Sequence, residues 1–186
     1  MLSYSDIMID IETLSTQGNA VITTIGAVKF NLGTQLTANN NYFYRRINIQ
    51  SCIDIGMETE DTTIEWWTKK KDTPEYEEIF NNKDRLYIVE TLNQFSEWLR
   101  DECNSDSIRI WSNGPSFDCA ILKSAYKRCN IILPWKYWNE RDVRTLYDLG
   151  GITKNNLNNL NNHNALNDCI TQIEGVNLSF SKIYKV

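Results

Sequence analysis

The chain has 186 residues, of which 41% are hydrophobic and 23% charged, and its formal net charge is −5 at pH 7. This composition is ordinary for a soluble globular protein, and the length predicts a single domain over residues 1–186 with a substantial core. The negative charge argues against a protein that coats nucleic acid without selectivity, because such proteins are normally basic.

The sequence also bears on the compartment. Five cysteines are widely spaced and form no Cys-x-x-Cys pair, which predicts reduced, mostly buried thiols and argues against a zinc site. No stretch approaches the roughly 20 apolar residues of a membrane span, and no secretory signal is visible at the start. We therefore expect a cytoplasmic protein without a membrane partner.

The first third of the chain predicts an antiparallel β-meander. Residues 6–12 alternate between two faces that both begin apolar, which is typical of a central strand covered on both sides. Residues 20–31 and 41–48 are rich in β-branched or aromatic residues and predict two further strands. The Gly, Asn and Thr residues of segment 31–40 predict a turn between them.

The remainder predicts helices interrupted by one short strand. Residues 60–82 are expected to be irregular or helical, and apolar spacing predicts a helix at about 89–103. A short strand at 108–111 is followed by helix-start signals and a helix to about residue 129. A helix over 141–149 ends at two glycines, and a final helix covers about 166–183. This order predicts an α/β domain with a central mixed sheet flanked by helices.

Two acidic residues close the first strand. The strand period places Asp10 and Glu12 on one face, with their Cα atoms about 6.5–7 Å apart, so they could share one metal ion or bridge two. They could also be an ordinary charged strand end. The apolar run before Asp10 favours a position where the sheet edge opens into a crevice.

Three further residues could join this site. Asp118 is expected in the first turn of its helix, where it either stabilises the helix N-terminus or faces the crevice while Phe117 is buried. His163 and Asp168 are five residues apart, about 140° around a helix, so one helix cannot present both to one site. We expect Asp168 on the final helix and His163 in the Asn-rich, mobile loop before it. A lone histidine can also be a bystander.

The types of these side chains predict a chemistry. Carboxylate oxygens favour Mg²⁺ or Mn²⁺ over zinc. Two such ions about 3.5–4 Å apart can stabilise the attacking and leaving oxygens of a displacement at phosphorus. A histidine with an ordinary pKa near 6.5 can accept the proton of the attacking water. A glycosidase that uses Asp10 and Glu12 is an alternative, but it leaves the other three residues unexplained.

In this order, the segments resemble the DEDDh group of 3′–5′ exonucleases, which have the ribonuclease H-like fold. Asp10 and Glu12 match the first motif of that family, Asp118 the second, and His163 with Asp168 the third. Residues 63–67, 111–114 and 141–145 resemble the subgroup of T-even phage exonuclease A and the ribonuclease T-like bacterial exoribonucleases. Much of the wider family has one residue fewer between the asparagine at 113 and the following phenylalanine.

The resemblance implies an activity and its cofactors. It implies removal of nucleoside 5′-monophosphates from single-stranded 3′ ends of DNA or RNA. Two Mg²⁺ or Mn²⁺ ions would be held by Asp10, Glu12, Asp118 and Asp168, with His163 as the general base. It also allows a homodimer and implies the cytoplasm of a bacterium or phage-infected cell. A catalytically silent nucleic-acid-binding module on the same fold is the alternative, although such proteins usually lack one of these five residues.

The resemblance also implies residues that bind the substrate. They would form the pocket for the terminal nucleotide, stack on a base or contact the strand, and they are Ile11, Thr13, Leu14, Trp66, Trp67 and Asn113. One or both of the tryptophans could instead belong to the core. Arg141 and Arg144 are expected to contact phosphate or, preferably, to pair with Asp142. The lysines at 69–71 are expected to be a solvated run or an aid to electrostatic steering of the strand.

Overall fold

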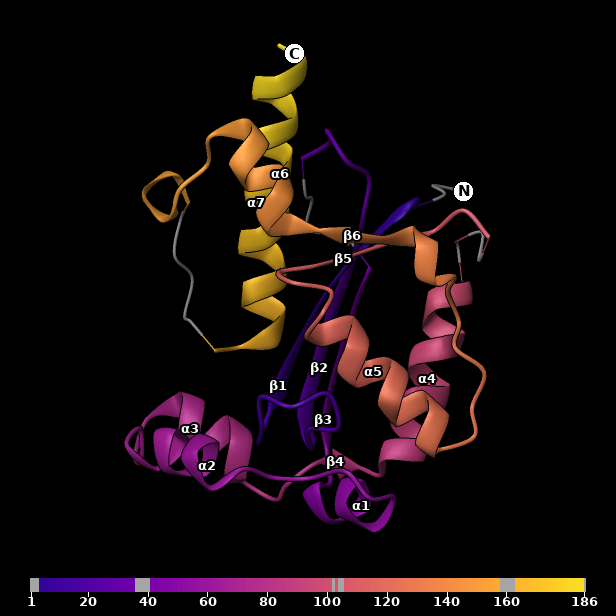
Figure 1. Ribbon diagram of the computed structural model, residues 1–186, viewed down its shortest axis with the longest axis vertical. Coiled ribbons are helices and arrows are strands. Elements are labelled where there is room, and N and C mark those ends of the chain that lie inside the picture. Colours follow the sequence, from indigo (N-terminus) through magenta and orange to yellow (C-terminus); the bar gives the residue numbers. More distant parts are fainter. Residues whose placement is uncertain (1–3, 36–40, 102, 104–105, 158–162, 186) are drawn as a thin grey trace.

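The computed structural model describes residues 4–35, 41–101, 103, 106–157 and 163–185, which form one six-stranded sheet with helices on both faces (Figure 1). The strands, in their order across the sheet, are β4 (Arg85–Leu86), β3 (Tyr42–Ile47), β2 (Ile22–Phe30), β1 (Asp6–Thr13), β5 (Arg109–Ser112) and β6 (Glu140–Asp142). β1, β2 and β3 pair antiparallel, whereas β5 pairs parallel with β1. The predicted mixed sheet and its opening meander are thus confirmed.

β1 is a central strand because both of its faces are apolar. Ile7, Ile9 and Ile11 enter the larger hydrophobic core on one face, and Met8 enters a smaller core on the other. Burial of each such side chain stabilises the fold by about 1.5–3 kcal/mol. The alternation therefore fixes the direction of every β1 side chain, including the carboxylates that follow Met8 on its face.

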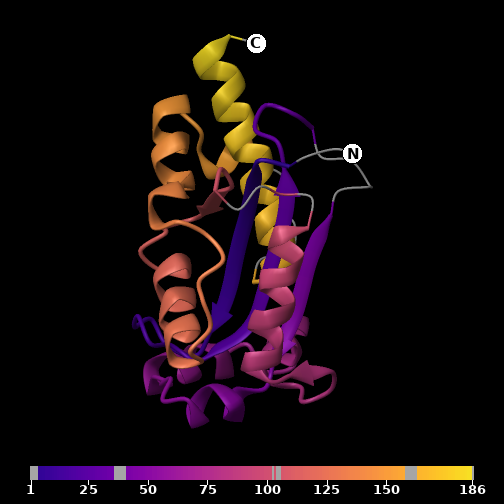
Figure 2. The same cartoon turned by 90° about the vertical axis from the view of Figure 1, so that its right-hand side faces the viewer.

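Each core is closed by a pair of helices. The helices are α4 (Ile88–Arg100) and α5 (Asp118–Arg128) on the isoleucine face of β1, with α6 (Val143–Gly150) and α7 (Ala165–Tyr184) on the methionine face. Figure 2 shows α4 and α7 with the long strands between them. α6 is capped at its C-terminus by Gly151, whose left-handed backbone (φ 61°) matches the predicted glycine stop.

A glycine in β2 lets α7 lie directly on the sheet. Gly26 pairs with Asp10 in the ladder between β1 and β2. A Cβ atom on Gly26 would lie 2.5 Å from the carbonyl carbon of Ala165, the first residue of α7. The absence of a side chain at Gly26 therefore permits the start of α7 to approach the end of β1, and with it Asp168.

Short helices lie beyond the carboxyl end of β1 (Figure 1). They are α1 (Ile49–Asp54), α2 (Asp61–Thr68) and α3 (Pro74–Phe80). The expected irregular or helical segment 60–82 thus contains α2 and α3, with Thr73 as the side-chain cap of α3 and Pro74 as its first residue. α1, β4 and β6 were not predicted.

Two 3₁₀ turns complete the described elements, η1 (Tyr137–Asn139) and η2 (Lys154–Asn156). Residues 158–162 of the Asn-rich loop, for which mobility was predicted, lie outside the described residues. Cys52, Cys119 and Cys169 are buried free thiols, and Cys129 is a half-buried one. Within the described ranges, no helix combines the length and the apolar character that crossing a membrane requires.

Candidate active site

An acidic cluster lies at the end of β1, under the first turn of α7. Asp10, Glu12 and Asp168 each bring one carboxylate oxygen to within 4.8 Å of the others. The strand alternation places Asp10 and Glu12 on the same face, as predicted, and Asp168 lies in the first turn of α7. Residues from opposite ends of the chain therefore converge on one site.

Asp118 reaches β1 from α5, the helix on the isoleucine face of that strand. It is the first residue of α5, is 4% exposed, and its Oδ1 accepts a hydrogen bond from the Ile11 N–H at 3.2 Å. Pairing between β1 and β5 ends at Met8 and Trp111, so the carboxylate satisfies a backbone donor beyond the last paired residue. Phe117 meets its expected burial only in part, because it packs half-buried against the larger core and also lines the pocket described below.

His163 lies in the turn that precedes α7. Asn164 caps α7 by accepting the Asn167 N–H at 3.1 Å, so His163 is just outside the helix, as predicted. Its backbone is left-handed (φ 62°), a conformation that is uncommon for a residue other than glycine. The His163 N–H donates to Asp168 Oδ2 at 3.1 Å, so the same carboxylate belongs to the cluster and stabilises this turn.

The cluster concentrates negative charge in a buried place. Burial and the nearby Asp118, Glu12 and Asp168 carboxylates raise the pKa of Asp10 well above its ordinary value. Burial, followed by the Asp168 and Asp118 charges, raises the pKa of Glu12 to about 8. Burial raises the pKa of Asp118 to about 7, although the hydrogen bond from Ile11 opposes this change, and burial also raises the pKa of Asp168. The ionised carboxylates therefore need positive charge beside them.

Gln172 is a residue of the site that the sequence did not reveal. It lies one helical turn after Asp168 on α7, and its Nε2 donates to Asp10 Oδ1 at 2.8 Å. Its Oε1 is buried without a hydrogen-bond partner among the described residues. The only sequence signal was its spacing of four residues from Asp168, which places both on one helix face. Carboxylate oxygens plus an unsatisfied amide oxygen fit a hard, hydrated divalent cation.

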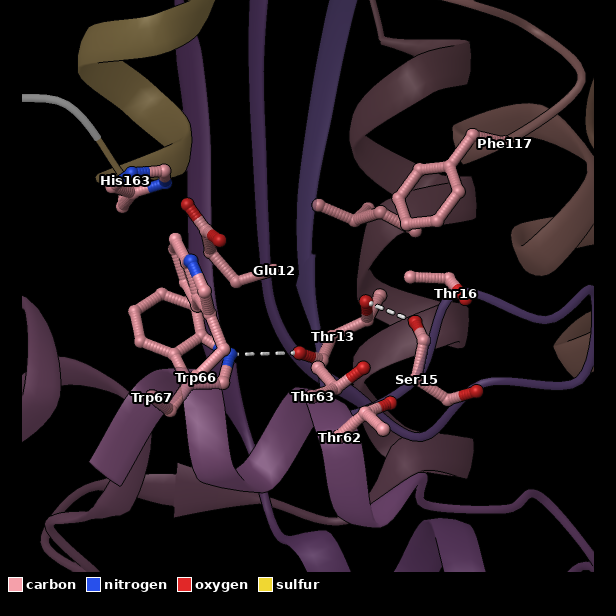
Figure 3. Close-up of a pocket in the computed structure, with 11 residues that line it drawn as sticks. Glu12, Thr13, Ser15, Thr16, Thr62, Thr63, Trp66, Trp67, Phe117 and His163 are labelled. Carbon is pink, nitrogen blue, oxygen red and sulfur yellow. Dashed lines mark hydrogen bonds between the residues drawn. The ribbon is translucent and has the colours of Figure 1, made fainter. Parts of the chain in front are cut away.

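A pocket with a volume of about 450 Å³ opens beside Glu12 (Figure 3). Its lining comes from the end of β1, the segment after it, α2 and the turns before α5 and α7, and comprises Ile11, Glu12, Thr13, Ser15, Thr16, Thr62, Thr63, Trp66, Trp67, Phe117 and His163. In Figure 3, Glu12 and His163 lie together near the two indoles, and most of the hydroxyl groups lie on the other side. The pocket and the acidic cluster therefore share Glu12.

The two tryptophans of α2 have different environments. Trp67 is 2% exposed, and its Nε1 donates to the Thr13 carbonyl at 3.1 Å, so it packs against the end of β1. Trp66 is 42% exposed, and its ring contacts the His163 ring edge-on with centroids 5.0 Å apart. Only Trp66 thus has a large free surface for stacking, whereas Trp67 belongs mainly to the core.

Two residues expected to bind substrate lie outside the pocket lining. Leu14 is 2% exposed and packs in the larger core, because the chain bends after β1 and turns this side chain inward. Asn113 is exposed, and its Oδ1 accepts a hydrogen bond from Arg144 Nε at 3.1 Å. Leu14 is therefore not among the residues that line this pocket, and its role in binding substrate stays a prediction. Asn113 orients an arginine on the Asp118 side of the site.

The expected pairing of the two arginines with Asp142 was also wrong. The Asp142 carboxylate caps α6 by accepting the backbone N–H groups of Arg144 and Thr145. The Arg141 guanidinium donates instead to the carbonyl oxygens of Trp138 and Glu140. The Arg144 charge is close enough to Asp118 to lower its pKa, against the larger effect of burial.

The sheet order, the helix arrangement and the acidic cluster define a DEDDh-type 3′–5′ exonuclease with a ribonuclease H-like fold. Residues 5–180 match the family model of the Rv2179c-like 3′–5′ exoribonuclease domain, so the chain belongs to that family.

An individual relative agrees with this assignment. The exodeoxyribonuclease of Enterobacteria phage T4 is 23% identical over an alignment of 198 positions, gaps included, which covers 90% of this chain and 86% of that protein.

Solved structures show the same fold. E. coli exonuclease I, in a zinc-bound complex with single-stranded DNA, matches 95% of the chain with a TM-score of 0.66 and 14% identity. This chain spans 40% of the length of exonuclease I. S. pombe Pop2p, in its Mg²⁺- and Mn²⁺-bound form, matches 97% of the chain and 84% of its own length with a TM-score of 0.55 and 12% identity.

Proposed function

We propose that this chain hydrolyses terminal phosphodiesters of single-stranded DNA or RNA from the 3′ end and releases nucleoside 5′-monophosphates. The observation that carries the proposal is the convergence of Asp10, Glu12 and Asp168 within 4.8 Å, with Asp118 bonded to the same strand. The family model describes an exoribonuclease, whereas the phage T4 relative is an exodeoxyribonuclease. The proposal therefore includes both sugars.

The four carboxylates would hold two Mg²⁺ or Mn²⁺ ions. Hard divalent cations prefer such oxygens, and the raised pKa values of Asp10, Glu12, Asp118 and Asp168 reflect charge that cations would offset. When bound, the ions would neutralise charge on the phosphate and make the attacking water more acidic. Gln172 supports this arrangement by orienting Asp10.

His163 would accept the proton of the attacking water. Its imidazole is half-buried, and burial, followed by the positive charge of Lys70, lowers its pKa. A lowered pKa keeps the ring neutral at physiological pH, and a neutral ring can take a proton. Edge contacts with Trp66 and Trp67, at centroid distances of 5.0 and 5.8 Å, orient the ring beside Glu12.

The pocket beside Glu12 would bind the terminal nucleotide. Its volume of about 450 Å³ is within the usual range of roughly 300–1,000 Å³ for small-ligand sites. Ile11 and Thr13 line it, and the exposed part of the Trp66 ring would stack on a base. With the nucleotide in this pocket, its 5′-phosphate would lie toward the acidic cluster, because Glu12 belongs to both.

Digestion of matched 5′-labelled single-stranded RNA and DNA tests the proposal. With Mg²⁺, the label should appear on a ladder that shortens from the 3′ end, and a chelator should abolish the reaction. An Asp10→Asn variant serves as the inactive control, because it removes a cluster carboxylate without changing the side-chain size. A wild-type protein that binds either strand with Mn²⁺ but cleaves neither would refute the proposal and favour the silent binding module.

A further inference from the structure

One lysine of the run at 69–71 differs from its neighbours. Lys70 follows α2 and is half-buried, whereas Lys69 and Lys71 are exposed. Its Nζ lies 4.2 Å from the centroid of the Trp66 ring and 5.6 Å from that of Trp67. Both rings line the pocket. The indoles thus hold the ammonium group of Lys70 next to two side chains of the pocket lining, to which Lys70 itself does not belong, and they restrict an otherwise flexible side chain.

Within the described part of the chain, no ion-pair partner neutralises the charge of Lys70. There its ammonium group forms no ion pair and donates no hydrogen bond to a protein acceptor. The charge nevertheless acts on the site, because it lowers the pKa of both Glu12 and His163. A lysine ammonium carries three donors, and aromatic rings leave them free for an anion.

We propose that Lys70 binds a backbone phosphate of the substrate strand, on the 5′ side of the scissile bond. The inference rests on the proposed function, which places the terminal nucleotide in the pocket and the scissile phosphate at the carboxylates. A terminal nucleotide brings only that one phosphate. The Lys70 ammonium group, an ordered cation beside Glu12 and His163, is therefore assigned to the next phosphate of the strand. Lysine binds phosphate as a point charge.

The salt dependence of cleavage tests the contact. Lys70→Gln should lower kcat/KM for a single-stranded oligonucleotide by about tenfold at low salt, as expected for loss of a charged hydrogen bond. It should also reduce the slope of log kcat/KM against log salt concentration by about 0.7, the value for one phosphate contact on a single strand. Lys69→Gln and Lys71→Gln are matched controls that remove the same charge from exposed positions, and each should change kcat/KM by less than about twofold.

A scan with methylphosphonates identifies the phosphate. Each linkage on the 5′ side of the scissile bond is replaced in turn by a neutral methylphosphonate, and kcat/KM is measured for the wild type and Lys70→Gln. At one position, the replacement should lower kcat/KM of the wild type by about the factor that Lys70→Gln alone already causes. At that position it should lower kcat/KM of the variant little further. Effects that multiply independently at every position would overturn the proposal, because Lys70 would then contact none of these phosphates.

Two comparisons separate other causes. A wild type that cleaves no strand contradicts the proposed function, whereas a cleaving wild type with Lys70→Gln equal to the Lys69 and Lys71 controls contradicts only the phosphate contact. A Lys70→Gln variant that shifts the pH profile without coupling to any phosphate also overturns the contact and assigns Lys70 to tuning of His163. Lys70→Arg, which keeps the charge, should retain the wild-type salt slope.

Discussion

Removal of one buried carboxylate should stabilise the metal-free protein. Glu12 is 8% exposed, and burial together with Asp168 and Asp118 raises its pKa from 4.5 to about 8. A pKa raised in the folded state contributes stability below the unfolded value, and that contribution is lost as the pH rises to the folded value. The metal-free wild type should therefore become less stable between about pH 4.5 and pH 8.

Glu12→Gln removes this loss of stability at rising pH with little change in side-chain size. The pKa difference of about 3.5 corresponds to a cost on the order of 5 kcal/mol at pH 8. The buried glutamine amide loses water in turn, which costs about 1–3 kcal/mol where partners are missing. We expect a net gain of roughly 2–4 kcal/mol, which raises Tm by about 4–16 °C for a domain of this size. Near pH 4.5 the gain should disappear.

Thermal unfolding in a chelating buffer from pH 4.5 to pH 8.5 measures this effect. Asp148→Asn is the matched control, because Asp148 is exposed on α6 and its replacement should change stability by no more than about 0.5 kcal/mol. With Mg²⁺ the order should reverse, since the wild type gains stability from bound ions and Glu12→Gln gains less. A Glu12→Gln variant that melts at or below the wild type at pH 8 without metal would show that the buried Glu12 charge does not destabilise the metal-free protein.

Three further predictions concern the residues around the cluster. His163→Asn should lower kcat by about 10²–10⁴-fold, and in the wild type the acid limb of kcat/KM should lie below pH 6.5 and stay there when Mg²⁺ is raised tenfold. Gly26→Ala should lower both Tm and activity, because its Cβ would lie 2.5 Å from the Ala165 carbonyl carbon. Trp66→Ala should raise KM about tenfold with little change in Tm, whereas Trp67→Ala should cost about 3–5 kcal/mol of stability in urea unfolding.

Local pattern was sufficient for the elements that carry their own periodicity. The alternation of residues 6–12 determined which face of β1 holds Asp10 and Glu12, and both lie there. The two glycines at the end of α6 and the turn before α7 were equally local signals. The order of the three motifs then indicated the family, because the chemistry needs these carboxylates at one site, whatever their positions in the sequence.

Elements defined by distant partners escaped prediction. β6 has three residues and exists through parallel pairing with β5, and β4 has two residues paired with β3. The Arg85 guanidinium donates to the carbonyl oxygens of Thr23 and Ile47, which are far away in the sequence. No local pattern in the sequence indicates such contacts.

The same limit applies to the substrate residues. Adjacent residues on a helix differ by about 100° in direction, so only one of Trp66 and Trp67 can face fully inward. The hydrogen bond from Trp67 to the Thr13 carbonyl decides the choice, and it depends on how α2 meets β1. The extent of the domain, a homodimer and the cytoplasmic location stay predictions.

Diffraction from crystals with Mn²⁺ and a nucleoside 5′-monophosphate tests whether the four carboxylates hold two divalent ions. The anomalous signal of manganese locates the ions without reference to the protein density. Two peaks are expected, with Asp10, Glu12, Asp118 and Asp168 among their ligands. Saturating Mn²⁺ without a peak at these carboxylates, while the nucleotide is visible in the pocket, would contradict this expectation.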